Sequence, residues 1–334
     1  MKKSKITIIV AELILLALAV FFVRKIFEED VPQKRVAVIV EKSGDKRWDS
    51  LFRGLKHSAD LNNLHLIICN TDDIKNADDE KALIDEQLDN NVDAFIICPA
   101  PGSNTLQMLQ ELNNEVPFVL ITEDVYTAGE GKDSGNDEKT EYTASGFPVI
   151  KPDNYQMGYK LGEELVKNNG GALAGKKIGI YAGREKTEAT VSQVKGVTDA
   201  LSGTGCDIIW EYYYLENQNV CSLVDNSQRV DYICAMDTDV LDILGEAAVD
   251  GKYDGAEIYG IGSSMKSVTL LDYGQIRCLV VPDGYDIGYE SIMELAKKLD
   301  NSFYSIESHE ADAKVIYRED IFSDDVERFL YSYE

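Results

Sequence analysis

The sequence predicts an α/β protein with two similar Rossmann-like lobes, each built on a parallel sheet, and a ligand cleft between the lobes. From residue 35 onward, short aliphatic runs alternate with amphipathic stretches, and the same order restarts near residue 177. Near-continuous apolar strands separated by helices are typical of a parallel sheet that is covered on both faces. A long apolar run at the start of the chain adds the prediction of a transmembrane anchor.

The segment at residues 1–27 has the pattern of a membrane anchor. Three lysines precede the apolar run Ile6–Val23, and two basic residues follow it. As a helix this run spans roughly 27 Å, close to the thickness of the hydrocarbon core. A cleaved signal peptide is the alternative, because Ala17–Ala19 fits an A-x-A site, but this triplet lies inside the apolar run. We therefore expect an uncleaved anchor in the cell membrane, a linker at residues 28–34, and the remainder outside, extracellular or periplasmic.

The strands of lobe one are predicted at four aliphatic runs, RVAVIV (35–40), HLIIC (65–69), AFIIC (94–98) and PFVLI (117–121). Lobe two begins at KIGIYA, from Lys177. The distance in sequence from Val36 to Gly54 equals that from Ile178 to Gly196. A tandem copy of one βαβ layout predicts two similar lobes. Residues 126–147 are rich in Gly, Asp, Glu, Ser and Thr, which predicts a surface loop.

The loops that follow the first strand of each lobe are the expected walls of the cleft. They are SGDKRW (43–48) in lobe one and GREKTE (183–188) in lobe two. In open parallel sheets, ligands bind at the carboxyl ends of the strands. Trp48 is therefore expected to stack on a flat or apolar face of a ligand. The alternative is that Trp48 packs under the helix that follows.

Composition and charge exclude several classes of function. The chain has 334 residues, of which 44% are hydrophobic, and a formal net charge of −26. A surface this acidic repels a phosphate backbone, so nucleic acid is not expected as a partner. No C-x-x-C, metal-ligand spacing or Ser-His-Asp arrangement occurs in the sequence. We expect no enzyme activity, no cofactor and no metal site.

Five stretches together resemble the type I periplasmic binding proteins of the ribose and galactose kind, which are related to the ligand domains of LacI-type repressors. They are RVAVIV, NVDAFIICPA, VPFVLITED, PDNYQMGYKLGEEL and VVPDGYDIGYESI. The resemblance covers about residues 34 to 320, and it rests on the order and spacing of these five stretches. In that family, three crossovers between the lobes form a hinge, and the lobes close on a ligand.

The resemblance implies a division of the chain. It places residues 35–124 with 283–305 in lobe one, residues 125–282 with 306–320 in lobe two, and residues 321–334 in a C-terminal tail. A late helix over Ile287–Asp300 would complete lobe one, and AKVIY (313–317) would return to lobe two.

The resemblance also carries ligand positions onto this sequence, and the sugar-specific set is incomplete. In the first loop, only Trp48 keeps the aromatic character of sugar binders. The arginine of the lobe-two loop is missing from its place, and Arg184, earlier in that loop, compensates. For Tyr214, plain strand packing is the alternative. The candidate ligand-binding residues are Asp45, Arg47, Trp48, Thr122, Glu123, Arg184, Glu185, Tyr214, Asp237 and Asp283.

These features predict a membrane-anchored extracellular solute-binding protein that captures a small polar ligand, a sugar or sugar-like molecule, for ABC-type uptake. An ABC permease is then the expected partner. The alternative is an accessory subunit that senses a ligand and signals to a membrane histidine kinase or receptor. An uncleaved anchor, and Glu12 inside its apolar run, motivate that alternative.

Overall fold

The computed structural model describes Leu15, Leu18 and residues 33–125, 127–128, 142–185, 187–215 and 218–330. Its contacts divide the chain into residues 1–33 and one compact unit, Lys34–Glu334. Within the part of the chain that the structure describes, no helix has the length and hydropathy to span a bilayer. Nearly all of the expected anchor at residues 1–27 lies outside the described residues, so the anchor stays a prediction.

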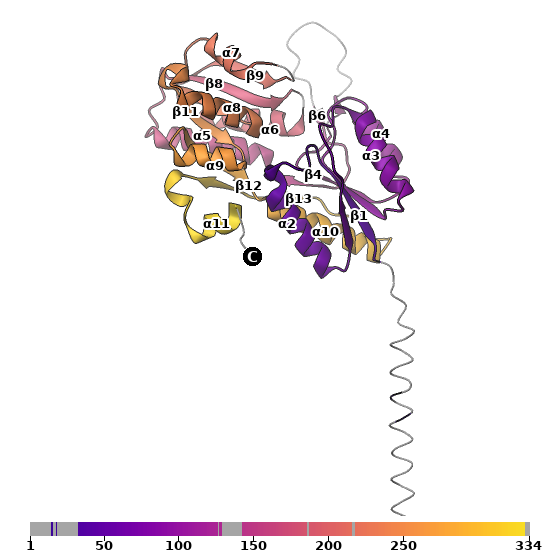
Figure 1. Cartoon of the computed structure of the whole chain (residues 1–334). Helices are drawn as coiled ribbons and strands as arrows, with labels where there is room; N and C mark the ends of the chain where they lie inside the picture. Colours follow the sequence, from indigo (N-terminus) through magenta and orange to yellow (C-terminus); the bar gives the residue numbers. More distant parts are fainter. Residues whose placement is uncertain are drawn as a thin grey trace, which may run out of the picture. The chain divides into compact units, whose positions relative to one another are not determined.

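Lobe one is built on a six-stranded sheet in the order β13-β7-β4-β3-β1-β2, with parallel neighbours throughout. Its strands are β1 (Arg35–Ile39), β2 (His65–Ile68), β3 (Ala94–Ile97), β4 (Phe118–Ile121), β7 (Val149–Pro152) and β13 (His309–Ala311). Helices α2 (Asp49–Leu61) and α10 (Gly284–Asp300) cover one face, and α3 (Ala77–Asp89) and α4 (Thr105–Leu112) cover the other (Figure 1). Alternate residues from Val36 to Val40 point into the two cores, which is why the run is apolar from Val36 onward.

Lobe two repeats this layout in the order β14-β12-β11-β10-β8-β9. Its strands are β8 (Lys177–Arg184), β9 (Asp207–Tyr214), β10 (Tyr232–Ala235), β11 (Glu257–Ile261), β12 (Ile276–Pro282) and β14 (Ala313–Ile316), of which only β14 is antiparallel to its neighbour. Helices α5 (Asn154–Asn168) and α6 (Glu188–Leu201) pack on one face, and α7 (Val220–Asp225), α8 (Thr238–Val249) and α9 (Met265–Asp272) on the other. The prediction of two similar α/β lobes with mostly parallel sheets is confirmed.

The chain passes between the lobes three times, at Asp153, Asp283 and Asp312. Asp153 caps the first turn of α5, and its carboxylate accepts a hydrogen bond from the Gln156 amide at 2.9 Å. Asp283 caps α10 in the same way. The Asp283 amide also donates to the Asp312 carbonyl at 2.9 Å, so two of the three crossovers bind each other directly.

The observed strands differ from the expected division of the chain in two places. β7 lies within the range 125–282, and β13 within 306–320, and both ranges were expected in lobe two. Both strands belong to the sheet of lobe one, where they pair with each other. The reason is that the chain returns to the first sheet after the segment 126–147 and leaves that sheet only at Asp153. Residues 126 and 129–141 of the expected surface loop lie outside the described residues, and β5 (Thr127–Ala128) pairs with β6 (Tyr142–Thr143).

The C-terminal segment also differs from expectation. Residues 321–334 were expected to be a tail, but Ile321 and Val326 are buried in the core of lobe two. Val326 lies on α11 (Asp324–Leu330), a short helix beside that lobe. Apolar residues spaced along this segment account for its docking.

Candidate functional site

A cavity of about 280 Å³ lies where the carboxyl ends of the two sheets face each other. Residues that follow β1, β3, β4, β8, β10 and β11 line it, together with Pro152 and Pro282 beside two of the crossovers. Parallel strands that end at one edge deliver their following loops to that edge, so two facing sheets enclose a shared space. The volume is near the lower end of the range for small-molecule sites, roughly 300–1,000 Å³.

Most of the predicted site residues line this cavity. They are Arg47, Trp48, Thr122, Glu123, Arg184, Tyr214 and Asp237. Three predicted residues do not line it. Asp45 binds Arg47, Asp283 caps α10, and Glu185 is exposed beyond the end of β8. The structure therefore brings seven of the ten predicted residues together and leaves Asp45, Glu185 and Asp283 outside the cavity wall.

Trp48 packs against lobe one, as the alternative interpretation expected, and it also lines the cavity; its contact with a ligand stays a prediction. Its indole Nε1 donates a hydrogen bond to the Glu41 carbonyl at 2.9 Å, and the ring packs against the lobe-one core. Another part of the same side chain lines the cavity. The protein thus holds the ring in place at the wall of the cavity.

Arg47 connects the two lobes across the cavity. Its Nη2 lies 2.9 Å from Asp45 in its own loop and 2.8 Å from Asp239 at the start of α8 in lobe two. Burial by itself lowers the pKa of the Arg47 guanidinium, but the hydrogen bonds and charges of Asp45 and Asp239 raise it above its ordinary value. Arg47 is therefore a permanent cation at the interface of the lobes.

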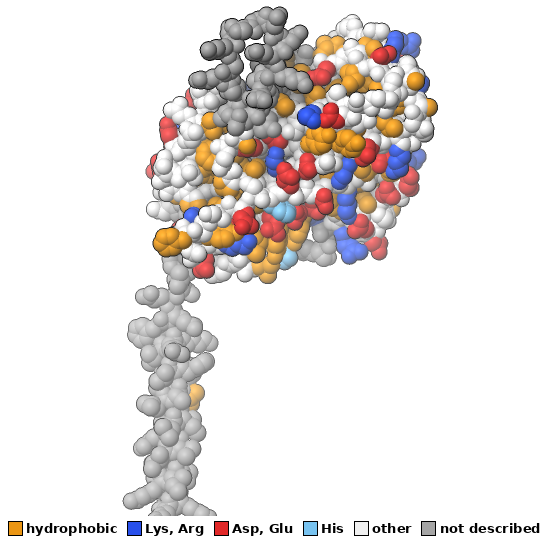
Figure 2. Space-filling view, turned by 180° about the vertical axis from the view of Figure 1, so that it is seen from behind, with side chains coloured by type: hydrophobic (Ala, Val, Ile, Leu, Met, Phe, Trp, Pro, Cys, Tyr) orange, Lys and Arg blue, Asp and Glu red, His pale blue; other side chains and the backbone are white. Residues whose placement is uncertain are grey.

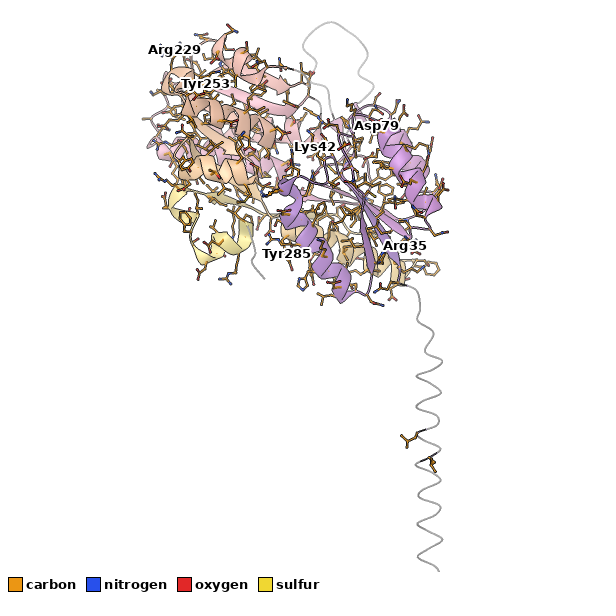
Figure 3. All side chains as sticks on the ribbon, viewed as in Figure 1. Arg35, Lys42, Asp79, Arg229, Tyr253 and Tyr285 are labelled. Carbon is orange, nitrogen blue, oxygen red and sulfur yellow. The ribbon has the colours of Figure 1, made fainter. Side chains whose placement is uncertain are left out.

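A second ion pair runs in the opposite direction. Arg184, at the end of β8 in lobe two, lies 3.0 Å from Glu41, which directly follows β1 in lobe one. Lys42, next along the chain, lies where the lobes face each other (Figure 3) and binds Asp73 at 3.0 Å. Each lobe thus extends one guanidinium to a carboxylate of the other.

Glu123 and Asp237 are carboxyl groups of a different kind. Among the described residues, neither forms an ion pair, although both line the cavity. The Ala189 amide donates to Glu123 at 3.4 Å, and the Val240 amide donates to Asp237 at 3.0 Å. Burial raises the pKa of Glu123 to about 7, and burial also raises the pKa of Asp237.

Thr122 occupies an unusual backbone conformation beside Glu123. Its φ of 69° lies in the left-handed region, which a β-branched residue rarely adopts. Its hydroxyl lies 3.2 Å from the Cys98 sulfur, and its carbonyl accepts a hydrogen bond from Asn154 at 3.3 Å. Strain of this kind is concentrated at functional sites.

Sequence reasoning missed several residues of this region. Glu41 and Asp239, the interlobe partners of the two arginines, were not predicted. A buried network beside the cavity was also missed: Asn154 donates to Glu188 at 3.0 Å, and Lys151 pairs with Glu188 at 2.7 Å. The position of Glu41 at the end of β1 was a usable signal. Glu188 begins a helix, and nothing in the local sequence indicates that it is buried.

Comparison of the sequence with models of protein families finds one matching family. A model described as a periplasmic binding protein domain matches residues 36–302. No curated protein sequence is similar enough to be matched.

Solved structures resemble the chain over most of its length. A carbohydrate transporter solute-binding protein from Agrobacterium radiobacter, in complex with D-arabinose, has a TM-score of 0.73 and 16% identity over 90% of this chain and 100% of its own. GanP, a glucose-galactose binding protein from Geobacillus stearothermophilus, has a TM-score of 0.70 and 15% identity, over 87% of this chain and 99% of its own. The Caulobacter myo-inositol binding protein, bound to myo-inositol, has a TM-score of 0.69 and 14% identity, over 88% of this chain and 96% of its own. At these identities the likeness shows the fold alone.

Proposed function

Because this chain belongs to the periplasmic binding protein family, we propose that it is a membrane-anchored solute-binding protein that captures a sugar or sugar-like molecule for ABC-type uptake. The observation that carries this proposal is the cavity between the lobes, which charged and hydroxyl side chains from both lobes line together with Trp48. Such a site hydrogen-bonds the hydroxyl groups of a ligand and covers its C–H face.

Both lobes contribute polar groups, which gives ligand capture a physical basis. Lobe one presents Trp48 and Glu123, and lobe two presents Tyr214, Asp237 and Arg184. A ligand that binds both sets holds the lobes together, because releasing it exposes groups that it had satisfied. Rotation about the three crossovers would open and close the cavity.

The three structural neighbours named above support solute capture over the other functions considered. Those named above are described as a solute-binding protein of a transporter and as sugar or inositol binding proteins. None of these descriptions is that of an enzyme, which favours binding over catalysis. The sensory alternative, with a histidine kinase or receptor as partner, is not favoured by them. The anchor at residues 1–27 would keep the protein near a permease in the same membrane.

Thermal unfolding of the full purified chain with a panel of aldoses, amino sugars, polyols and nucleosides tests the proposal. A ligand present at 100 times its Kd stabilises the folded state by about 2.7 kcal/mol. We expect the melting temperature to rise with at least one sugar or polyol and not with the nucleosides. If no sugar or polyol raises it at millimolar concentration, the proposed capture function is wrong.

A further inference from the structure

The cations that line the cavity are already engaged by the protein. Lys42 binds Asp73 at 3.0 Å, Arg47 binds Asp239 at 2.8 Å, and Arg184 binds Glu41 at 3.0 Å. Each of these pairs places a positive charge within contact distance of a negative one. None of the three cations is therefore left over to neutralise a further carboxylate or to attract an anionic ligand.

Two carboxyl groups of the same cavity have no such partner. Glu123 follows β4 in lobe one, and Asp237 follows β10 in lobe two, so they face the cavity from opposite lobes. Among the described residues, their polar contacts are hydrogen bonds, including those from the Ala189 and Val240 amides, and no ion pair reaches either carboxylate. The cavity thus contains two carboxyl groups that, when ionised, no ion pair of the described residues neutralises.

Placing unpaired carboxylates in a partly desolvated cavity is unfavourable. The raised pKa values of Glu123 and Asp237 are the expected consequence, since burial is the largest cause of each shift. The charge of Arg184 lowers the pKa of Glu123, and that of Arg47 lowers the pKa of Asp237, but neither offsets burial. A cation placed in the cavity would stabilise both carboxylates in their charged form.

We propose that the ligand of this cleft is a sugar-like molecule that carries a protonated amino group, and that Glu123 and Asp237 neutralise its ammonium. The hydroxyl groups of such a ligand bind the remaining polar groups of the cavity, and Trp48 covers its apolar face. This inference rests on the proposed function, because it names the ligand class of the same cleft. The net charge of −26 would also attract a cationic ligand toward the protein.

Calorimetric titration of the full chain with matched sugars is the test. The pairs are D-glucose with 6-amino-6-deoxy-D-glucose, and D-galactose with 6-amino-6-deoxy-D-galactose, together with D-glucosamine. N-acetyl-D-glucosamine is the control, because acetylation retains the nitrogen and removes its charge. At pH 6.5, where an alkyl amine is protonated, we expect at least one amino sugar to bind at least tenfold more tightly than its neutral parent.

Charge-neutralising variants locate the effect. Glu123→Gln and Asp237→Asn keep an oxygen that accepts the hydrogen bonds of Ala189 and Val240. Each is expected to weaken binding of the amino sugar at least tenfold and of the neutral sugar less than threefold. Glu246→Gln is the matched control, because it removes one charge from the exposed face of α8, where Glu246 binds Lys266 at 2.6 Å. It should leave both affinities unchanged.

The outcomes separate this inference from the proposed function. If neutral sugars bind as tightly as their amino counterparts, or if the two variants weaken both kinds equally, the inference is overturned and sugar capture stands. If no sugar of either kind binds, sugar capture itself is overturned. Should a variant fail to fold, titration of the unchanged protein near pH 7 in two buffers of different ionisation enthalpy decides. Protons are expected to be released with the amino sugar and not with the neutral one, and no release would count against the inference.

Discussion

Trp48 shows how one side chain combines packing with a place in the cleft. It donates to the Glu41 carbonyl, contacts the lobe-one core and lines the cavity. Trp48→Ala is therefore expected to lower both the stability of the ligand-free protein and its affinity for ligand, each by about 1–3 kcal/mol. Chemical denaturation without ligand, and calorimetry with ligand, measure the two effects.

Trp210 is the matched control, because it is the other of the two tryptophans of the chain. It is buried in lobe two, stacks on Tyr212 and does not line the cavity. Trp210→Ala should cost about 3–5 kcal/mol of stability with little change in affinity. If Trp48→Ala leaves affinity unchanged, Trp48 has a packing role only.

Glu80 is a buried carboxyl group, outside the cavity, whose titration makes stability depend on pH. Its side chain is fully buried, one oxygen accepts from the Ala100 amide at 3.0 Å, and the other has no partner among the described residues. Burial raises its pKa to about 8. The folded form holds the Glu80 proton more tightly than the unfolded form does, and this tighter binding contributes to the free energy of unfolding. The contribution is fully present below the unfolded pKa, about 4.3, and is lost as pH rises through about 8.

Glu80→Gln removes this dependence while keeping an acceptor for Ala100. The variant should gain stability relative to the unchanged protein as pH rises from 5 to 9, by on the order of a few kcal/mol. Denaturation curves of both proteins across this range give the difference. A difference that is constant with pH would show that Glu80 does not titrate in this way.

At the scale of elements, close helix packing explains the repeated spacing seen in the sequence. A Cβ at Gly54 on α2 would lie 2.0 Å from the Tyr285 carbonyl oxygen on α10. At Gly196 on α6, the corresponding Cβ would lie 2.1 Å from the Tyr155 carbonyl oxygen on α5. Both lobes therefore pack one helix pair backbone against backbone, and glycine stands at the same place in each.

Gly54→Ala should destabilise the protein by about 1–3 kcal/mol, because the backbone of α10 has to move. Gly44→Ala is the control, since a Cβ there meets no atom within 4 Å. Denaturant midpoints compare the two variants. Equal midpoints would show that α2 and α10 can separate without cost.

At the scale of the whole molecule, the charged surface affects hydration, whereas the interlobe ion pairs affect how the two lobes close. On the face shown in Figure 2, acidic side chains lie spread among basic ones, so this face has the mixed charge of a well-hydrated surface. The ion pairs Arg47–Asp239 and Arg184–Glu41 instead cross the cleft at 2.8 and 3.0 Å. Because the four side chains come from both lobes, these contacts exist only when the lobes are close.

Replacing both arginines by methionine should favour the open form. Partly exposed pairs contribute about 0–1 kcal/mol each, enough together to shift a balanced equilibrium severalfold. Small-angle scattering of the ligand-free chain should then give a larger radius of gyration for the double variant than for the unchanged protein. Lys314→Met with Lys266→Met removes two exposed ion pairs outside the cleft as a control. The same radius in all three proteins would contradict a role in closure.

The sequence by itself determined the elements and their repetition. Strands buried on both faces need continuous apolar runs, and helices covered on one face need amphipathic ones, so both patterns are local and readable. The repeat added the similarity of the lobes, and the topology of parallel sheets then located the loops after β1 and β8 at the cleft. Trp48 was placed at the cleft in this way, whereas Arg184 was assigned to the site through the family resemblance.

The tertiary structure alone decided the lobe to which β7 and β13 belong and the carboxylates that face Arg47 and Arg184. Strands of three or four residues carry too little local pattern to specify a sheet, and only the route of the chain through its crossovers selects one. Asp239 is 192 residues from Arg47, and Glu41 is 143 residues from Arg184. Contacts between residues so far apart depend on how two folded lobes meet, which no periodicity of the sequence encodes.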